Sequence, residues 1–287
     1  MLQQTRVAAV IEHYHEFLRR FPTVKKLAAA REASVLAAWS GLGYYRRARM
    51  LHAAAKVIVR ELGGKFPATS ESWRKLPGIG RYTSAAIASI AFDEPVAVVD
   101  GNVERVLQRI SGRQLAGEEF WTAANDLLDR ERPGDFNQAI MELGATVCTP
   151  RSPACLMCPV IELCATRGEL ARTTKSVRQK KREIHYALDC CDGQAFLVQR
   201  ARDASLMPGM WELPELNVTS RAKGCGHSKG GPCLTLRHSI TVTDYTVRVF
   251  QQPAPPAISG CWVTKAQILK LPLTGLARKI LRASAVI

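Results

Sequence analysis

The sequence carries four closely spaced cysteines just past its midpoint. They follow the pattern C-x6-C-x2-C-x5-C and are Cys148, Cys155, Cys158 and Cys164. Thiolates at this spacing can converge on one metal centre, either a [4Fe–4S] cluster or a Zn²⁺ ion. Disulfides are the weaker alternative in a reducing compartment. A second group, Cys225, His227 and Cys233, is interpreted as a free-thiol loop rather than a metal site.

A glycine-containing turn precedes a segment of helical spacing at residues 81–92. Residues 76–80 read LPGIG, and the glycines allow the backbone to reverse sharply and to approach a ligand closely. The N–H groups at the start of the following helix have no partner within that helix, so they suit an anion. An ordinary helix–turn–helix is the alternative for this turn taken alone.

Two polar residues, Asp100 and Asn102, precede another helical segment at residues 103–111. Either side chain can cap that helix by accepting hydrogen bonds from its first N–H groups. Capping is the favoured interpretation of Asp100 when the residue is considered by itself.

The charge balance points to a class of partner. The chain has 287 residues, enough for two domains, and its 40 Lys and Arg against 25 Asp and Glu leave a net charge of +15. This surplus favours a polyanion, most simply nucleic acid phosphate, over an unspecific basic surface. No stretch approaches the ~20 apolar residues of a membrane helix, and no signal peptide is visible. We therefore expect a cytoplasmic protein without a membrane partner.

Helical periodicity dominates the first two-thirds of the chain. The expected helices cover residues 2–21, 24–30, 33–40, 45–62, 81–92, 103–111, 118–130 and 135–147. Alternation typical of strands follows a basic segment. The expected strands cover residues 184–190, 195–200, 236–250 and 260–264, before a closing helix at 275–285. The sequence thus predicts a mainly α domain at 1–165, a basic linker at 166–183 and a smaller α+β domain at 184–287.

Together, the cysteine spacing, the hairpin and the helical domain resemble the endonuclease III and adenine DNA glycosylase superfamily. The resemblance is strong over residues 1–165 and weak from 184 onward. It implies a [4Fe–4S] cluster on the four cysteines, with Arg151 and Arg167 presented to DNA. It also implies a helix–hairpin–helix motif whose DNA phosphate contacts come from the hairpin residues Leu76, Gly78 and Gly80.

In that superfamily, an aspartate at the spacing of Asp100 from the hairpin is catalytic. A carboxylate beside a sugar can stabilise the cationic transition state of glycosidic cleavage. The lyase members carry a lysine after the hairpin as an amine nucleophile, and Tyr82 stands at that position here. We therefore expect a monofunctional glycosylase with Asp100, Tyr82 and Asn102 at its catalytic centre. A lyase acting on oxidised pyrimidines is the disfavoured alternative.

Two further motifs resemble the adenine glycosylases that act on adenine opposite 8-oxoguanine. Residues 1–5 read MLQQT and residues 41–45 read GLGYY. The resemblance implies that Gln4 and Tyr44 wedge into the duplex and that Leu2 packs on the extruded adenine, as base flipping requires. Helix packing is the alternative role for Tyr44. The full expected substrate-binding set is Leu2, Gln3, Gln4, Thr5, Leu42, Tyr44, Gln138 and Thr241.

The tail resembles the C-terminal domain of the same family, a Nudix relative that recognises 8-oxoguanine. The likeness rests on LVQR at 197–200 and GMWELP at 209–214. A Nudix hydrolase would next need a glutamate-rich helix for Mg²⁺, and residues 220–224 read SRAKG instead, so nucleotide hydrolysis is not expected. The family's lesion-reading loop aligns with residues 240–242, where Thr241 keeps a hydroxyl and Val242 lacks an imidazole.

The expected partner is double-stranded DNA containing adenine opposite 8-oxoguanine or guanine, bound by a monomer in a bacterial-type, nucleoid-associated location. In the family, the proton donor to adenine is a glutamate just upstream of MLQQT. The sequence begins at Met1, inside that motif, which leads us to expect a late start assignment or a fragment, and severely reduced activity if the sequence is complete. A catalytically silent mismatch-binding protein is the alternative function.

Overall fold

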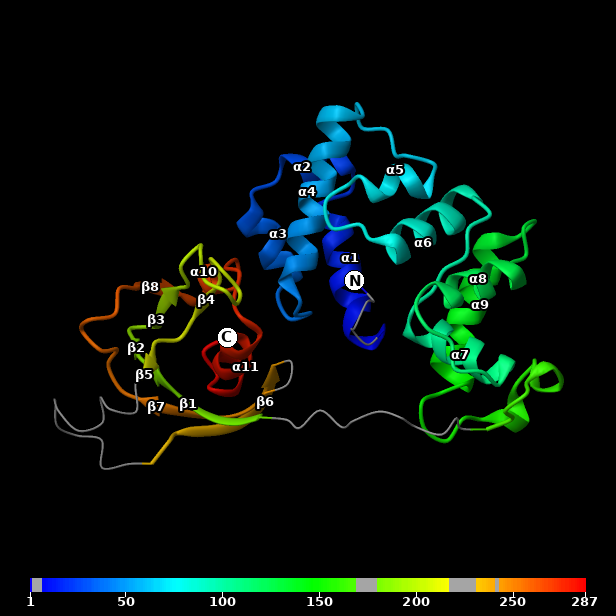
Figure 1. The fold of residues 1–287 in the computed structure, drawn as a ribbon. Helices are drawn as coiled ribbons and strands as arrows, with labels where there is room; N and C mark the ends of the chain where they lie inside the picture. Colours follow the sequence, from blue (N-terminus) through cyan, green and yellow to red (C-terminus); the bar gives the residue numbers. More distant parts are fainter. Residues whose placement is uncertain (2–6, 169–179, 217–230, 241–242) are drawn as a thin grey trace. The chain divides into compact units, whose positions relative to one another are not determined.

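The computed structural model describes residues 1, 7–168, 180–216, 231–240 and 243–287 (Figure 1). The chain divides into two units. The first combines residues 1–56 with residues 176–287, and the second is residues 57–175. Among the described residues, no helix has both the length and the apolar character needed to cross a bilayer.

The beginning of the chain contributes helices to the first unit. They are α1 (Val7–Arg20), α2 (Val24–Ala29), α3 (Glu32–Trp39) and α4 (Tyr45–Glu61), whose last residues belong to the second unit. Thr23 begins α2, since its hydroxyl accepts a hydrogen bond from the Lys26 amide at 3.2 Å. These helices bury an apolar cluster in which Phe17 meets Trp39 edge to face, with ring centroids 5.9 Å apart. Met210, from the end of the chain, lies in the same cluster and is fully buried.

The end of the chain contributes two sheets to the first unit. One has the order β5-β1-β7-β6, formed by β1 (Lys180–Leu188), β5 (Glu215–Leu216), β6 (Leu234–Ile240) and β7 (Thr243–Gln251). Its β1 and β7 run parallel, and its other neighbours run antiparallel. The other sheet is formed by β2 (Cys190–Cys191), β3 (Gln194–Gln199), β4 (Trp211–Glu212) and β8 (Cys261–Thr264), all paired through β3.

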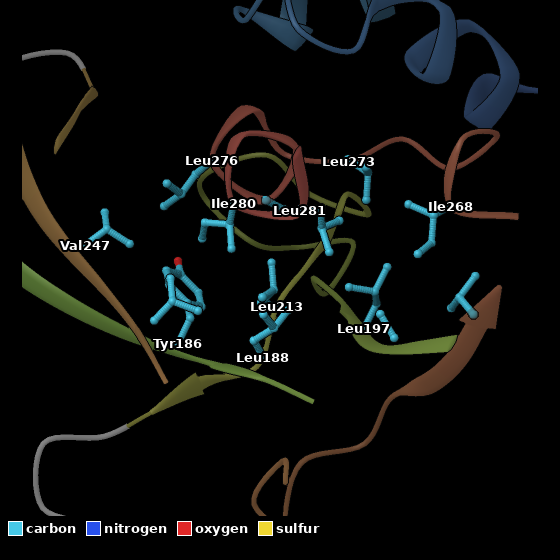
Figure 2. Packing of buried hydrophobic residues seen from close by; sticks show 14 residues of the cluster. Tyr186, Leu188, Leu197, Leu213, Val247, Ile268, Leu273, Leu276, Ile280 and Leu281 are labelled. Atoms are coloured by element: carbon cyan, nitrogen blue, oxygen red, sulfur yellow. The ribbon is translucent and has the colours of Figure 1, made fainter. Parts of the chain in front are cut away.

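A helix at the end of the chain covers these sheets. The last two helices are α10 (Lys265–Ile268) and α11 (Gly275–Ala283). Apolar side chains recur along α11 at helical spacing, and Leu276, Ile280 and Leu281 point from it into the core shared with Leu197 and Val247 (Figure 2). The expected α+β architecture of the tail is thereby confirmed.

Two strand predictions need correction. Residues 236–250 were expected to form one strand, but they form most of the antiparallel pair β6 and β7, in which Ile240 lies opposite Thr243. The prediction was wrong because alternation continues on both sides of the reversal, so periodicity does not reveal it. In addition, β1 begins at Lys180, four residues before the expected start, because its basic residues pair with β7.

The second unit is helical in its described part. It contains α5 (Ser70–Arg74), α6 (Arg81–Phe92), α7 (Gly101–Ser111), α8 (Glu118–Leu127), α9 (Pro133–Glu142), the π-helical turn η1 (Leu143–Val147) and the 3₁₀ turns η2 (Cys155–Met157) and η3 (Ile161–Leu163). Its core lies between α7, α8 and α9 and includes Val103, Leu107, Phe120 and Ile140. The mainly helical class expected for this region is confirmed.

One expected helix changes its winding within this unit. Residues 135–147 were expected as one α-helix, but the last turn from Leu143 is π-helical. Gly144 in this turn packs directly on α7, because a Cβ there would stand 2.7 Å from the Cβ of Asn102. The glycine therefore permits a close approach between η1 and the start of α7.

Replacing a buried leucine tests the packing of the first unit. Leu197 is 0% exposed, whereas Leu269 is 54% exposed. We expect Leu197→Ala to lower the free energy of unfolding by about 2–5 kcal/mol, because it leaves a cavity. The matched change Leu269→Ala should cost less than about 0.5 kcal/mol. Urea denaturation followed by circular dichroism measures both, and equal losses would contradict the packing described.

Candidate active site and metal centre

The predicted hairpin joins two helices of the second unit. Leu76 is buried and anchors the turn, and the Ile79 amide donates to the Leu76 carbonyl at 3.3 Å. Gly78 has φ +75°, a conformation that favours glycine. Gly80 is the N-cap of α6, and no side chain caps that end within the described residues. A helix start without a side-chain cap suits an anion such as phosphate, and the phosphate contact of the hairpin stays a prediction.

Sequence analysis did not predict the helix before the hairpin, α5. It has only five residues, too few to show a helical period. The sequence feature that could have revealed it is Thr69, a residue type that often caps helices. Its hydroxyl accepts a hydrogen bond from the Ser72 amide at 3.4 Å. The helix–hairpin–helix motif is therefore complete as α5, the turn and α6.

Asp100 caps α7. Its Oδ1 accepts hydrogen bonds from the Asn102 and Val103 amides, both at 2.9 Å, and its Oδ2 accepts one from the Asn102 side chain at 3.3 Å. The capping interpretation is thus confirmed for Asp100. A carboxylate has lone pairs for about four hydrogen bonds, so Oδ2 keeps capacity for a further ligand.

A buried asparagine that sequence analysis missed positions the segment before Asp100. Asn137 is 1% exposed. Its Oδ1 accepts from the Val98 amide at 3.0 Å, and its Nδ2 donates to the Val96 carbonyl and the Ser89 hydroxyl, both at 2.9 Å. The only signal for it in the sequence is a polar residue on the buried face of α9.

Tyr82 lies near Asp100. Its hydroxyl donates to the Met141 sulfur at 3.6 Å. Burial raises the pKa of Tyr82, and the Asp100 carboxylate raises it further, so the phenol stays neutral near pH 7. Gln138 lies one turn before Met141 on α9, is exposed, and donates to the Gly134 carbonyl of its own helix at 3.2 Å. The second unit thus brings Asp100, Asn102 and Tyr82 together.

The predicted wedge residue belongs to the first unit. Tyr44 is 52% exposed, so it does not serve helix packing. The Arg47 guanidinium lies 5.0 Å from the centre of its ring, within range of a cation–π contact. Leu42 is buried in the apolar cluster of α1 and α3, so it anchors the loop that carries Tyr44. The other expected substrate contacts, Leu2, Gln3, Gln4, Thr5 and Thr241, lie outside the described residues.

The four cysteines of the second unit line one cavity together with Arg109. The Arg109 guanidinium donates to the Cys148 Sγ at 3.2 Å, and the Arg167 amide donates to the Cys164 Sγ at 3.4 Å. Hydrogen bonds to the sulfur atoms of metal ligands fix their orientation, so these contacts suit a metal-binding loop. Arg151 and Arg167 are exposed on this loop, as a DNA contact requires.

The four-thiol cavity fits a [4Fe–4S] cluster by its ligand set. Such a cluster takes one protein thiolate at each iron, and four cysteines line this cavity. When bound, the cluster would cross-link the ends of the loop.

Comparison with known proteins decides the family. Residues 1–119 match the HhH-GPD superfamily of base excision DNA repair proteins, and residues 148–164 match the iron–sulfur binding domain of endonuclease III. Adenine DNA glycosylase of Mus musculus is 34% identical over 362 aligned residues, covering 98% of this chain and 69% of that protein. The chain belongs to the adenine DNA glycosylase family.

Further similar proteins support this family assignment. Adenine DNA glycosylase of Homo sapiens is 51% identical over 174 residues, covering 58% of this chain and 32% of that protein. The chain thus spans about a third of the length of the human relative. A solved thermostable thymine-DNA glycosylase is similar in fold, with a TM-score of 0.54 at 28% identity over 58% of this chain and 79% of that chain.

Family membership confirms several predictions. The chain is a base excision repair DNA glycosylase by family, its partner class is DNA, and its cofactor is the iron–sulfur cluster rather than zinc. The roles of individual site residues stay predictions.

Removing one cluster ligand tests the metal centre. We expect Cys158→Ser to lose most of its iron and acid-labile sulfide and to melt at a lower temperature, because cluster binding contributes to folding. Cys191→Ser, an exposed cysteine outside the loop, is the matched control and should keep both. Full iron content in Cys158→Ser, or zinc in the unaltered protein, would contradict the assignment.

Asn137 and its neighbour Gln138 give a second matched pair. Asn137→Ala leaves the buried Val98 amide without its partner, so we expect a loss of about 1–3 kcal/mol in the free energy of unfolding. Gln138→Ala should change it by less than about 0.5 kcal/mol, because that side chain is exposed. Chemical denaturation distinguishes the two, and a neutral Asn137→Ala would show that Asn137 does not hold the segment before Asp100.

Proposed function

We propose that this protein hydrolyses the N-glycosidic bond of adenine in double-stranded DNA, where adenine is mispaired with 8-oxoguanine or guanine. The observation that carries the proposal is the Asp100 carboxylate, fixed at the start of α7 with capacity left on Oδ2. When the bond between sugar and base breaks, adenine leaves with the electron pair and takes up a proton, and the sugar becomes cationic. A carboxylate placed beside the sugar stabilises that charge until water adds its oxygen and loses a proton, which balances the proton that adenine gained.

The neighbouring tyrosine supports a monofunctional reaction. A phenol cannot form an imine with the sugar aldehyde, unlike the lysine of lyase members. Because burial and the Asp100 charge raise the pKa of Tyr82, its hydroxyl is available as a neutral hydrogen-bond donor or acceptor. Base removal without strand cleavage is therefore the expected reaction.

Other residues supply DNA binding in this proposal. The hairpin residues Leu76, Gly78 and Gly80 offer backbone groups to a phosphate, and Tyr44 fills the space left by the extruded adenine. The preference for 8-oxoguanine rests on the Nudix-like resemblance of the tail and on Thr241, outside the described residues. A monomeric state and a nucleoid-associated location belong to the same proposal.

The alternative is a protein that binds the mismatch in DNA without cleaving the glycosidic bond. The curated relatives are named as glycosylases, so the family favours an enzyme over a silent binding protein. Adenine release separates the two, because a binding protein holds the mismatch and frees no base.

Substituting Asp100 tests the proposal. Asparagine caps helices about as well as aspartate, so Asp100→Asn should preserve folding while removing the charge. We expect single-turnover adenine release from an adenine–8-oxoguanine duplex to fall by about 10²–10³-fold or more. Asp126→Asn, at an exposed position on α8, is the matched control and should react normally.

The assay is run on this chain and on a version extended upstream with the family's proton-donor segment. Strand breaks should appear only after hot alkali, and borohydride should trap no covalent adduct. Undiminished release by Asp100→Asn would refute the role of Asp100. Tight mismatch binding without release in either version would establish the binding protein instead.

A further inference from the structure

The loop between α3 and α4 holds Tyr44 in an unusual conformation. Gly41, Gly43 and Tyr44 have φ values of +110°, +70° and +48°. For tyrosine this is a left-handed conformation that persists only when the surroundings hold it in place. Inside the loop, the Trp39 indole donates to the Gly43 carbonyl at 3.1 Å, and the buried Leu42 side chain anchors the turn.

The residues on either side of this loop are bound to the end of the chain. The Ser40 hydroxyl donates to the Leu273 carbonyl at 2.9 Å, and the Tyr45 hydroxyl donates to the same carbonyl at 3.0 Å. The Arg278 Nε donates to the Ser40 hydroxyl at 3.1 Å. Ser40 is 2% exposed and Tyr45 is 5% exposed, so water does not compete effectively for these bonds.

Leu273 is a firm anchor for the loop. It is 0% exposed, and its side chain lies in the core beside α11 (Figure 2). The Trp211 amide donates to the Pro272 carbonyl and the Thr274 amide donates to the Trp211 carbonyl, both at 2.9 Å. These bonds fix the backbone on both sides of Leu273 without using its carbonyl, which is left to bind Ser40 and Tyr45.

We propose that the Leu273 carbonyl and Arg278 are positioning groups that set the loop at residues 41–44 in the pose in which Tyr44 enters DNA. The proposal rests on the proposed function, because it assumes that Tyr44 wedges into the duplex. It gives the end of the chain a role in extruding adenine. This role is additional to the expected recognition of 8-oxoguanine, the base opposite adenine. In this proposal, the loop at residues 41–44 enters DNA, and Leu273 and Arg278 from the end of the chain hold that loop in place within the first unit.

Two simpler roles must be separated from positioning. In the first, Arg278 only adds positive charge for DNA, and in the second, its contacts only stabilise the fold. Arg282→Ala removes the same charge from an exposed position one turn further along α11 and controls for the first. Tyr14→Phe, at a half-exposed tyrosine of α1, is the matched control for Tyr45→Phe.

Hydrogen exchange of the full chain without DNA tests the loop directly. We expect amides in residues 40–47 to exchange about 5–10-fold faster in Arg278→Ala and in Tyr45→Phe, as the loss of one buried hydrogen bond implies. Arg278→Lys should restore part of the protection, and the two control variants should match the unaltered protein. Unchanged exchange in both test variants would overturn the proposal, since the loop would then be held without the end of the chain.

The second readout is mismatch binding and single-turnover adenine release. Both should fall by about 5–10-fold in Arg278→Ala and Tyr45→Phe, with recovery in Arg278→Lys and no change in Arg282→Ala. Faster exchange with unchanged binding and release would overturn the positioning role. Exchange needs no activity and binding needs no bond cleavage, so a failure of the proposed chemistry at Asp100 is distinguishable from a failure here.

Discussion

Arg109 is buried, 4% exposed, and its guanidinium joins α7 to the cysteine loop of the second unit. It donates to the Cys148 carbonyl at 3.2 Å and to the Thr149 carbonyl at 2.8 Å, while Arg105, one turn earlier on α7, donates to the Cys148 carbonyl at 2.8 Å. A buried charge that loses its partners is strongly destabilising. Since α7 begins at Asp100, the same helix fixes both the cysteine loop and the candidate catalytic carboxylate.

This arrangement gives the cluster a structural consequence beyond its own loop. The thiolates of a bound cluster bring negative charge to the cavity that Arg109 lines. The loop also ends on α7, because the Ala165 amide donates to the Ile110 carbonyl at 3.0 Å and the Thr166 hydroxyl donates to the Arg109 carbonyl at 2.7 Å. A bound cluster would thus stabilise the helix that carries Asp100.

Features that are encoded in short stretches of the sequence could be predicted, whereas features that depend on contacts between distant residues could not. The cysteine spacing, the hairpin at residues 76–80 and the long helices were predictable because each is encoded within a few turns of chain. The reversal between β6 and β7 was missed because alternation is the same on both strands. Asn137 was missed because its hydrogen-bond partner, the Val98 amide, lies 39 residues away. For the same reason, periodicity could not reveal that the chain's two ends share one unit.

The role proposed for Asp100 combines helix capping and catalysis in one side chain. The cap occupies Oδ1 with two amide hydrogen bonds, and Oδ2 accepts only the longer bond from Asn102. Capping alone would be served equally by asparagine or serine, so it does not require a charge at this position. Stabilising a sugar cation does require one. The cap therefore orients the carboxylate, while its negative charge stays available for the catalytic role that we propose for Asp100.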